Sequence, residues 1–425
     1  MSRNETHRAR VAPLAAGTAG GEGALLELNA RGEQDAHLYG FEAAASNEFT
    51  TESWRRATPG ALELKVTDVE LVHGKPNRIP VPRRGDLIGD VYLEITLPQL
   101  KTATTGDRWI KDVAYVLINN VALFIDDVEL SHATRYFYYL DDQMFTPRSK
   151  QDAIDELIGH RPLRMDRDQV VALPLKFFTR KRHHSFQTWF PCMNASRSDI
   201  VIDFGCEKLQ NATDSTNKAA YYELSLIKTL PARLFVNYVM LDKLERARFI
   251  SRPTPVLAEV VTEFVEHSWS ESTSTTGLDD LLPSDRVTID MSAVNFPVKY
   301  IVFAAVSTLD LKRGVYDNFL DIIEEVSIRL DGVHERETIR TPEFFSMLQE
   351  HAYFKKSTSR FIYLYSFSID PANTKPAGHF AMSTTKKTTV QIKLKEPRRD
   401  VQIRMYCAGY KFIDFIEGVA RVKFI

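Results

Sequence analysis

Short runs of alternating apolar and polar residues dominate the chain from residue 62 onward. In the clearest of them, the stretch 79–98, Pro80 and Pro82 keep the backbone extended and residues 83–86 favour a turn. Four apolar residues then alternate with polar ones, namely Val91, Leu93, Ile95 and Leu97. An apolar period of two predicts a β-strand with one buried face.

Other runs of this kind predict further strands. The apolar positions of residues 62–66 change phase after Asp68, which predicts a bulge or a turn at that point. Residues 222–230 and 234–240 predict two more strands, with Pro231 between them. Short extended runs separated by turn residues are typical of an antiparallel β-sandwich.

Two of these runs end in similar turns. Residues 121–125 lead through Asp126-Asp127 into another strand, which predicts a hairpin. Residues 326–330 lead into Asp331-Gly332 about 205 residues later, a distance that fits two similar sandwiches in tandem. The repeat predicts that equivalent side chains face the two cores: Val121, Leu123 and Ile125 in the first, and Val326, Ile328 and Leu330 in the second.

One helix is predicted between the strands. Ser149 is suited to be its N-cap, Gly159 is suited to end it, and residues 153–158 carry an apolar stripe. Long amphipathic helices are otherwise scarce, so we expect this one to be a loop helix that lies on a sandwich.

Composition and charge narrow the classes of function. The chain has 425 residues, 44% of them hydrophobic, which is enough for a sizeable core and favours two domains, or alternatively three. Its formal charge of −2 gives no overall attraction to phosphate, so a direct role in binding nucleic acid is disfavoured. No apolar run is long enough to span a bilayer and the N-terminus does not resemble a signal peptide, so we expect a soluble protein made in the cytosol.

The cysteines and the possible glycosylation triplets carry little chemistry. The chain has three cysteines, an odd number, and none of them has CxxC spacing. We therefore expect reduced thiols in the core at Cys192, Cys206 and Cys407. Asparagine begins an N-x-S/T triplet at three positions that we expect to be surface loops, namely Asn4, Asn194 and Asn211.

The densest basic cluster is the segment 176–184. With its phenylalanines and the nearby Trp189 it could stack nucleic-acid bases, but we expect a solvated loop beside a strand. His183 and His184 have no third ligand at metal spacing, which disfavours a metal site. Hydrolase, metalloprotease and nucleotide-binding motifs are absent, and the carboxylates are scattered along turns.

The chain contains three recognisable motifs: R-x-G-D-L-I at residues 83–88, E-R-x-R-F at 245–249 and N-x-P-V-K at 295–299. With several other segments they resemble, in family order, the double jelly-roll major capsid proteins of large double-stranded DNA viruses of the nucleocytoplasmic type. In that family the first and third motifs begin strands and the second closes the first jelly roll. The resemblance extends over about residues 23–415, and its segments are 24–40, 83–97, 236–249, 295–303, 341–383 and 404–410. Asp126-Asp127, where the family would have glycine, and Cys407, where alanine is usual, depart from the pattern.

The resemblance implies an all-β fold of two tandem antiparallel jelly-roll sandwiches, with short loop helices and an N-terminal arm. We expect the arm at residues 1–58, the first jelly roll at 59–245, and the linker and second jelly roll at 246–425. The arm is poor in periodic apolar residues, so we expect neighbouring subunits to order it. We expect no catalytic, cofactor-binding or metal-binding residues, no cofactor and no enzymatic activity.

The function implied by the resemblance is that of a major capsid protein. Homotrimers would form pseudo-hexagonal capsomers that tile an icosahedral virion shell, after assembly in the host-cell cytoplasm. Their partners would be neighbouring capsomers and minor capsid proteins, which could also provide indirect contact with an inner membrane, and nucleic acid would not be bound directly. One alternative is a minor capsid subunit. Another is a carbohydrate-binding or glycan-processing β-sandwich protein, which should show exposed aromatic residues beside carboxylates in one groove.

Overall fold

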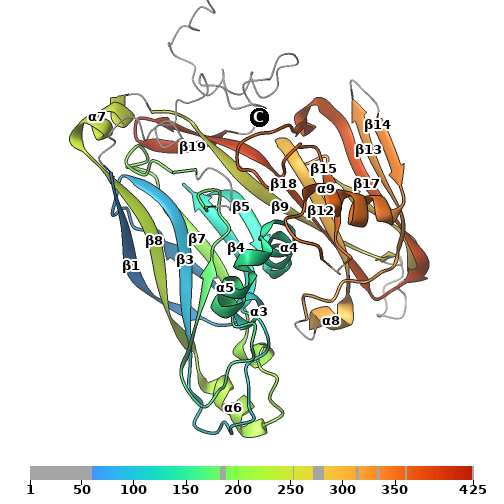
Figure 1. The fold of residues 1–425 in the computed structure, drawn as a ribbon, viewed down its shortest axis with the longest axis horizontal. Helices are drawn as coiled ribbons and strands as arrows, with labels where there is room; N and C mark the ends of the chain where they lie inside the picture. Colours follow the sequence, from blue (N-terminus) through green and yellow to red (C-terminus); the bar gives the residue numbers. More distant parts are fainter. Residues whose placement is uncertain are drawn as a thin grey trace, which may run out of the picture.

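The strands of a computed structural model form four antiparallel sheets, two in each half of the chain (Figure 1). The structure describes residues 60–181, 188–251, 253–270, 282–312, 315–332, 336–358 and 361–423. The predicted arm, residues 1–58, therefore lies outside the described residues, as do His183 and His184.

The first half is an eight-stranded jelly roll. One sheet has the order β1-β8-β3-β6 and the other the order β2-β7-β4-β5. The strands are β1 (Gly60–Val72), β2 (Pro76–Pro80), β3 (Leu87–Leu97), β4 (Ile118–Ile125), β5 (Val128–Thr134), β6 (Gln169–Pro174), β7 (Ile200–Cys206) and β8 (Thr229–Leu241).

The second half repeats the same topology. Strands β9, β18, β12 and β15 lie side by side in one sheet, and β11, β17, β13 and β14 in the other. The shorter β10 and β16 and the terminal β19 extend these sheets at their edges. The bounds are β9 (Val256–His267), β10 (Trp269–Ser270), β11 (Leu282–Asp290), β12 (Pro297–Ser307), β13 (Ile323–Gly332), β14 (Arg336–Arg340), β15 (Tyr363–Ser366), β16 (Phe380–Ala381), β17 (Thr385–Arg398), β18 (Val401–Ile416) and β19 (Val419–Lys423).

The two predicted hairpins occupy equivalent places. The pair β4 and β5 ends one sheet of the first jelly roll, and β13 and β14 end the matching sheet of the second. The prediction for the two cores is confirmed, because all six side chains are buried: Val121, Leu123, Ile125, Val326, Ile328 and Leu330. The pairing of β13 with β14 ends at Leu330 and Arg336, so Asp331 and Gly332 lie in the hairpin connection as predicted, although that connection is longer than two residues and both residues still pair with β17.

The first hairpin turn shows why aspartate is tolerated there. Asp126 and Asp127 both have positive φ, 51° and 61°, the left-handed conformation that a two-residue hairpin turn requires. The Asp126 carboxylate accepts hydrogen bonds from the backbone N–H of Asp199 and the hydroxyl of Ser198. Asp127 forms an exposed ion pair with Arg78.

This geometry makes a prediction for Asp127. Asp127→Gly should leave the free energy of unfolding unchanged or raise it by up to about 1 kcal/mol, because relief of the left-handed strain offsets the loss of a weak surface pair. Asp127→Ala is the matched control: it loses the same pair without gaining the freedom of glycine, so it should destabilise. Urea unfolding of the three proteins measures the order, and a glycine variant less stable than the alanine variant would contradict the account.

Two strands differ from the sequence prediction. The strand β1 keeps one unbroken register with β8 from Gly60 to Val72, so the expected bulge or turn near Asp68 is wrong. The strand β8 runs straight through Pro231, and residues 218–226 form the helix α6 (Lys218–Leu226) in place of a strand. The amide of Asn217 caps that helix by accepting from the N–H groups of its first turn.

The predicted loop helix exists, but it begins two residues early. It is α5 (Arg148–Ile158), so Ser149 lies inside its first turn and Pro147 takes the cap position. Gly159 ends it with φ of 76°, as predicted. Only Ile158 is buried, whereas Ala153 and Leu157 are exposed, so the apolar stripe is covered at one end only.

The structure contains further helices that alternation did not predict. The most buried is α4 (Arg135–Phe145), in which all residues but one are buried. The others are α3 (Val113–Val116), η3 (Leu209–Ala212), α7 (Lys243–Ser251), α8 (Thr308–Lys312), the π-helical turn η5 (Phe344–Leu348), α9 (Gln349–Tyr353) and η6 (Met382–Thr384). Within the described residues no helix has the length and apolar character needed to cross a membrane.

The strand predicted from the apolar alternation of residues 91–97 and the three cysteines behave as predicted. In β3, Val91, Leu93, Ile95 and Leu97 are buried and alternate with partly exposed residues. The three cysteines are free and buried. Burial raises the pKa of the Cys192 and Cys206 thiols to about 12, so both stay protonated and unreactive near neutral pH.

Candidate assembly interfaces

The two jelly rolls are joined by a contact in which α4 and β5 of the first lie against one face of the sheet β9-β18-β12 of the second; we call it the internal contact. Figure 1 shows α4 and β5 between the two sandwiches. The ring of Phe137 lies 5.4 Å from that of Tyr406, and the ring of Phe145 lies 5.5 Å from that of Tyr300. Aromatic pairs at these distances contribute beyond their buried area.

A cluster of hydrogen-bonded side chains lies within the internal contact. The carboxylate of Glu263 accepts from the hydroxyl of Tyr406 at 2.7 Å and from the guanidinium of Arg404 at 2.6 Å. Thr134, at the end of β5, shares a hydrogen bond of 2.5 Å with the Tyr406 hydroxyl. The Arg404 guanidinium also lies 4.3 Å from the centre of the Tyr136 ring. The contacts of Thr134 and Tyr136 cross from the first jelly roll to the second and so fix their relative orientation.

The described part of the basic segment, residues 176–181, is not the solvated loop that the sequence predicted. The Lys176 ammonium lies 2.6 Å from a carboxylate oxygen of Asp142 and 3.1 Å from one of Asp141. Arg180 makes two hydrogen bonds to Asp141, at 2.6 and 2.7 Å. Burial opposes the charge of Arg180, but Asp141 outweighs it and raises the pKa of the guanidinium. The described part of this segment is therefore a buried ionic cluster packed on α4, and no nucleic-acid patch.

A second buried cation lies at the family's N-x-P-V-K motif. Lys299 has a fully buried side chain and lies 3.2 Å from the carboxylate of Glu259, in β9. Its ammonium also donates to the backbone carbonyl of Asn373. Lys299, near the start of β12, is thus paired with Glu259 of β9, two strands away in the same sheet, and with a loop carbonyl. This explains how a charged residue can lie in a strand that is buried along its whole length.

The R-x-G-D-L-I and E-R-x-R-F motifs meet in space. The Asp86 carboxylate accepts from the backbone N–H of Leu241 at 2.8 Å and forms an ion pair of 2.6 Å with Arg246. A Cβ atom on Gly85 would lie 2.5 Å from the Cβ of Tyr238, so only glycine fits there. The two motifs together tie the start of β3 to the end of β8, where the chain leaves the first jelly roll.

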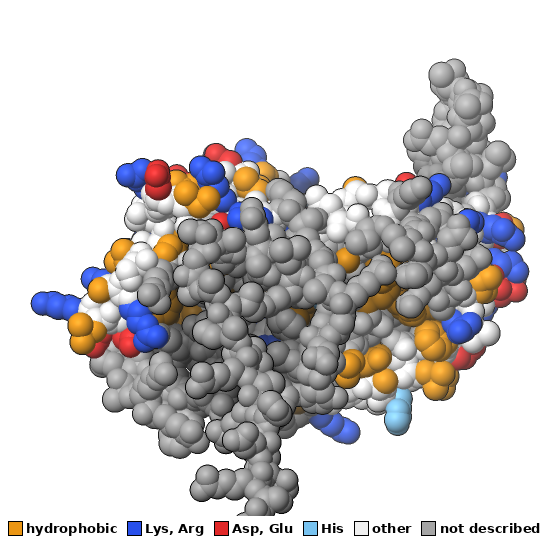
Figure 2. All heavy atoms as spheres, turned by 90° about the horizontal axis from the view of Figure 1, so that it is seen from above, with side chains coloured by type: hydrophobic (Ala, Val, Ile, Leu, Met, Phe, Trp, Pro, Cys, Tyr) orange, Lys and Arg blue, Asp and Glu red, His pale blue; other side chains and the backbone are white. Residues whose placement is uncertain are grey.

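Large apolar side chains are exposed at several places on the described chain, among them β1 and the second jelly roll. On β1, Leu62 is 65% exposed, Leu64 53% and Val66 40%. On the second jelly roll, Ile339 of β14 is 47% exposed, and Met347 and Leu348 of η5 are 65% and 63% exposed. Figure 2 shows apolar and charged side chains mixed on the face seen from above. Large exposed apolar residues that cluster are typical of interaction sites.

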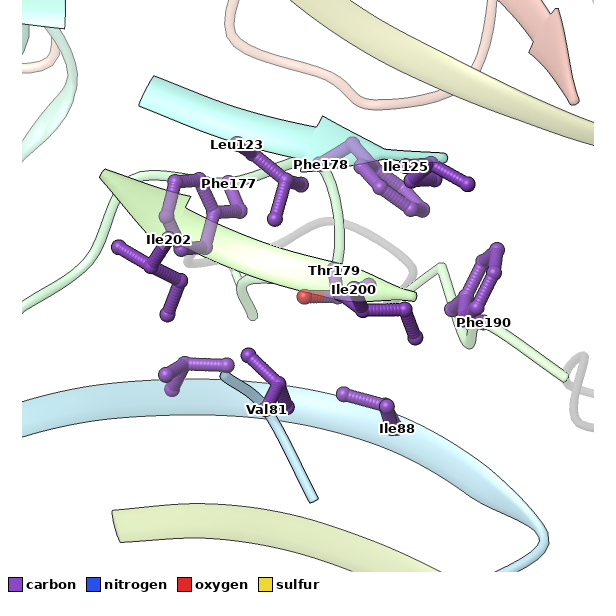
Figure 3. Close-up of a pocket in the computed structure, with 11 residues that line it drawn as sticks. Val81, Ile88, Leu123, Ile125, Phe177, Phe178, Thr179, Phe190, Ile200 and Ile202 are labelled. Atoms are coloured by element: carbon purple, nitrogen blue, oxygen red, sulfur yellow. The ribbon is translucent and has the colours of Figure 1, made fainter. Parts of the chain in front are cut away.

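The cavities do not provide a sugar groove. The first lies between the two sheets of the first jelly roll, is lined almost wholly by apolar side chains such as Leu123, Phe178 and Phe190, and has room for little more than one water molecule (Figure 3). The second lies at the internal contact beside Lys176, Arg180 and Glu259, and its aromatic residues are buried. Neither places exposed aromatic residues beside carboxylates.

Two further expectations concern metal binding and the three N-x-S/T triplets. Among the residues that the structure describes, no group of three His, Cys, Asp or Glu side chains could hold a metal ion. Asn211 is exposed, as predicted. Asn194 is buried and its amide donates to the backbone carbonyl of Phe249 at 3.1 Å, so the expectation of a surface loop is wrong there. Asn4 lies outside the described residues.

Comparison with known proteins agrees with this architecture. The family model described as major capsid protein N-terminus matches residues 49–242, and the model described as large eukaryotic DNA virus major capsid protein matches residues 245–406. The major capsid protein of Pyramimonas orientalis virus is 22% identical over 95% of this chain and 99% of its own length. That of Paramecium bursaria Chlorella virus 1 is 24% identical, covering 88% of this chain and 87% of its own length.

Solved structures show the same fold. The quasi-atomic model of the PBCV-1 virus capsid aligns with a TM-score of 0.68 at 16% identity, covering 87% of this chain and 98% of the other. The Faustovirus major capsid protein aligns with a TM-score of 0.61 at 9% identity, covering 84% and 91%. With two complete jelly rolls and family matches along most of its length, the chain belongs to the major capsid protein family of large eukaryotic DNA viruses.

Proposed function

We propose that three copies of this chain form a pseudo-hexagonal capsomer that tiles an icosahedral virion shell. The observation that carries the proposal is the repeated topology: two jelly rolls of the same strand order stand side by side in each chain. Three-fold symmetry then places six similar sandwiches around one axis, which gives a tile with near-equivalent edges. The names of the relatives, which are major capsid proteins, support the same role.

Several finer parts of this function are also proposals. The sheet pairing supports a division near residue 245, with the arm at 1–58, the first jelly roll at 59–245, and the linker and second jelly roll at 246–425. Neighbouring capsomers and minor capsid proteins would be the partners in the shell, and assembly would take place in the host-cell cytoplasm. The buried charges and small cavities described above support a structural role without catalysis.

The trimer is tested by the mass of the protein in solution. Multi-angle light scattering at micromolar concentration should give about three times the 48.5 kDa of one chain. Each pair of subunits should bury well over the ~1,600 Å² of a standard contact, because a shell needs permanent tiles. A mass that stays at one chain over the whole concentration range would contradict the proposal.

A further inference from the structure

We propose that the exposed side of α6 binds an acidic polypeptide segment that also carries aromatic or aliphatic side chains. We call this surface the α6 ridge, and it consists of Lys218, Tyr222 and Leu226. The inference goes beyond the proposed capsomer, because binding at the α6 ridge requires neither a second copy of the chain nor a shell.

The α6 ridge lies at the tip of the first jelly roll, far from the point where the chain enters it. Gly60 pairs with Leu241, just before α7, whereas Val72 pairs with Thr229, just after α6. The strand β1 is 13 residues long, so these two ends lie roughly 40 Å apart. In Figure 1, α6 is accordingly at the bottom of the molecule and α7 at the upper left. The ridge is therefore remote from the N-terminal arm.

The three side chains of the α6 ridge follow one another at intervals of four residues. Residues i and i+4 are neighbours on the surface of a helix, so Lys218, Tyr222 and Leu226 form one row. Tyr222 is 66% exposed and Leu226 is 62% exposed. The helix is anchored to the protein by the buried Ala220 and Leu224. The row thus presents an ammonium group, an aromatic ring and an aliphatic side chain to solvent in a fixed order.

The helix α6 is held in place by the loop that precedes α3. The carboxylate of Glu223 accepts hydrogen bonds from the backbone N–H groups of Lys101 and Thr102, at 3.0 and 2.9 Å, and from the Thr102 hydroxyl at 2.6 Å. The amide of Asn217, which caps the helix, donates to the carboxylate of Asp107 at 2.9 Å. A surface that is ordered in advance loses less conformational entropy when a partner binds.

The charges beside the α6 ridge favour an acidic partner. Lys218 and Lys228 are exposed, and no ion pair joins either lysine to a carboxylate among the residues that the structure describes. The carboxylates of Glu223 and Asp107 are occupied by the hydrogen bonds described above. Burial opposes the charge of Glu223, but its hydrogen bonds outweigh burial and hold its pKa below the usual range. The ridge therefore has uncompensated cations next to its apolar side chains.

The combination of side chains favours a polypeptide over a nucleic acid. Tyr222 and Leu226 are spaced like the anchors of a helix that enters an apolar groove, and tyrosine is enriched at binding hot spots. Two lysines are far fewer than the phosphate contacts of a typical DNA-binding protein, and the formal charge of −2 adds no general attraction. A segment with carboxylates beside an apolar side chain matches both parts of the ridge.

Two synthetic polymers serve as probes for this surface. One is a fluorescent copolymer of glutamate and tyrosine, and the other is polyglutamate, which supplies the charge alone. In fluorescence anisotropy with the full chain, the copolymer should bind more tightly than polyglutamate. Tyr222→Ala should weaken binding of the copolymer roughly tenfold and leave polyglutamate almost unaffected. Lys218→Gln should weaken binding of both probes and reduce its dependence on salt.

Two substitutions on α7 are the matched controls. Leu244 is 80% exposed and Lys243 is also exposed, on a helix at the other end of the first jelly roll. Leu244→Ala and Lys243→Gln should therefore leave both affinities unchanged. Because the substituted side chains are exposed, thermal unfolding of all four variants should match that of the wild type.

The role of Glu223 as a positioning residue has its own readout. Glu223→Ala should speed amide hydrogen exchange in residues 218–226 and weaken binding of the copolymer, although the α6 ridge itself is unchanged. Glu223→Gln keeps a hydrogen-bond acceptor and should recover part of both effects.

Several results would overturn the proposal. These are the absence of copolymer binding at micromolar protein, equal binding of the copolymer by the wild type and Tyr222→Ala, and equal binding of the copolymer and polyglutamate by the wild type. Binding of a DNA duplex as tight as that of the copolymer would also overturn it, by showing a general anion patch. None of these results affects the trimer, whose mass in solution tests the proposed function separately.

Discussion

Replacing Lys176 by methionine is expected to lower the free energy of unfolding by about 3–5 kcal/mol. The side chain is 6% exposed, and its ammonium lies between the carboxylates of Asp141 and Asp142, which are 5% and 9% exposed. Methionine fills the space but leaves the Asp142 charge without its cation. The hydroxyls of Tyr115 and Thr146 still donate to Asp142 and recover part of the loss. Urea unfolding measures the difference.

A surface pair serves as the control for this prediction. Lys65 pairs with Glu63 on β1, where the two side chains are 37% and 42% exposed, so Lys65→Met should change stability by less than about 1 kcal/mol. Equal effects of the two lysine substitutions would show that the cluster at α4 is solvated after all.

Replacing Leu123 or Ile328 by aspartate is expected to unfold the jelly roll that contains it. Leu123 is 5% exposed and Ile328 1%, and both point between the sheets of their own sandwich. An unpaired carboxylate there costs several kcal/mol, and the loss of the apolar side chain costs about 2–5 more, which is comparable with a domain's whole margin of ~5–15 kcal/mol. Limited proteolysis with mass spectrometry should show cleavage concentrated in the first half for Leu123→Asp and in the second for Ile328→Asp.

Volume-conserving variants control for the position itself. Leu123→Met and Ile328→Leu should cost less than about 1.5 kcal/mol and keep the protease resistance of the wild type. If either aspartate variant folds with normal resistance, the inward direction of that side chain is wrong, and with it the equivalence of the two hairpins.

The alternation of apolar and polar residues predicted strands well where one face of a sheet is buried and the other is partly exposed to solvent. The run from Val91 to Leu97 is of this kind, and its period of two appears directly in the burial of β3. The same signal misled at residues 62–66. There the apolar residues face outward, whereas Leu71 of the same strand faces the core, so the apparent change of phase is a change of face within an unbroken strand.

The pattern of apolar and polar residues could not predict helices that are buried on all sides. The helix α4 contains the run from Tyr136 to Leu140, which is aromatic, favours strands by propensity and has no polar face to reveal a helical period. The buried cluster at Lys176 was missed for another reason. Its carboxylates come from a helix more than thirty residues earlier in the chain, and a charge run with distant partners has the same local sequence as a solvated one.

The family motifs, in contrast, pointed to places where the fold is tied together. Asp86 and Arg246 belong to different motifs and form one ion pair, and Lys299 of a third motif is the buried cation of β12. The strand topology of both jelly rolls agrees with the resemblance from which the fold was expected.

Negative-stain electron microscopy of the purified protein tests the central claim most directly. If three chains, each with two equivalent jelly rolls, form one tile, averaged particles should show three-fold symmetry and a hexagonal outline. Particles of single chains, or rings without three-fold symmetry, would contradict the account.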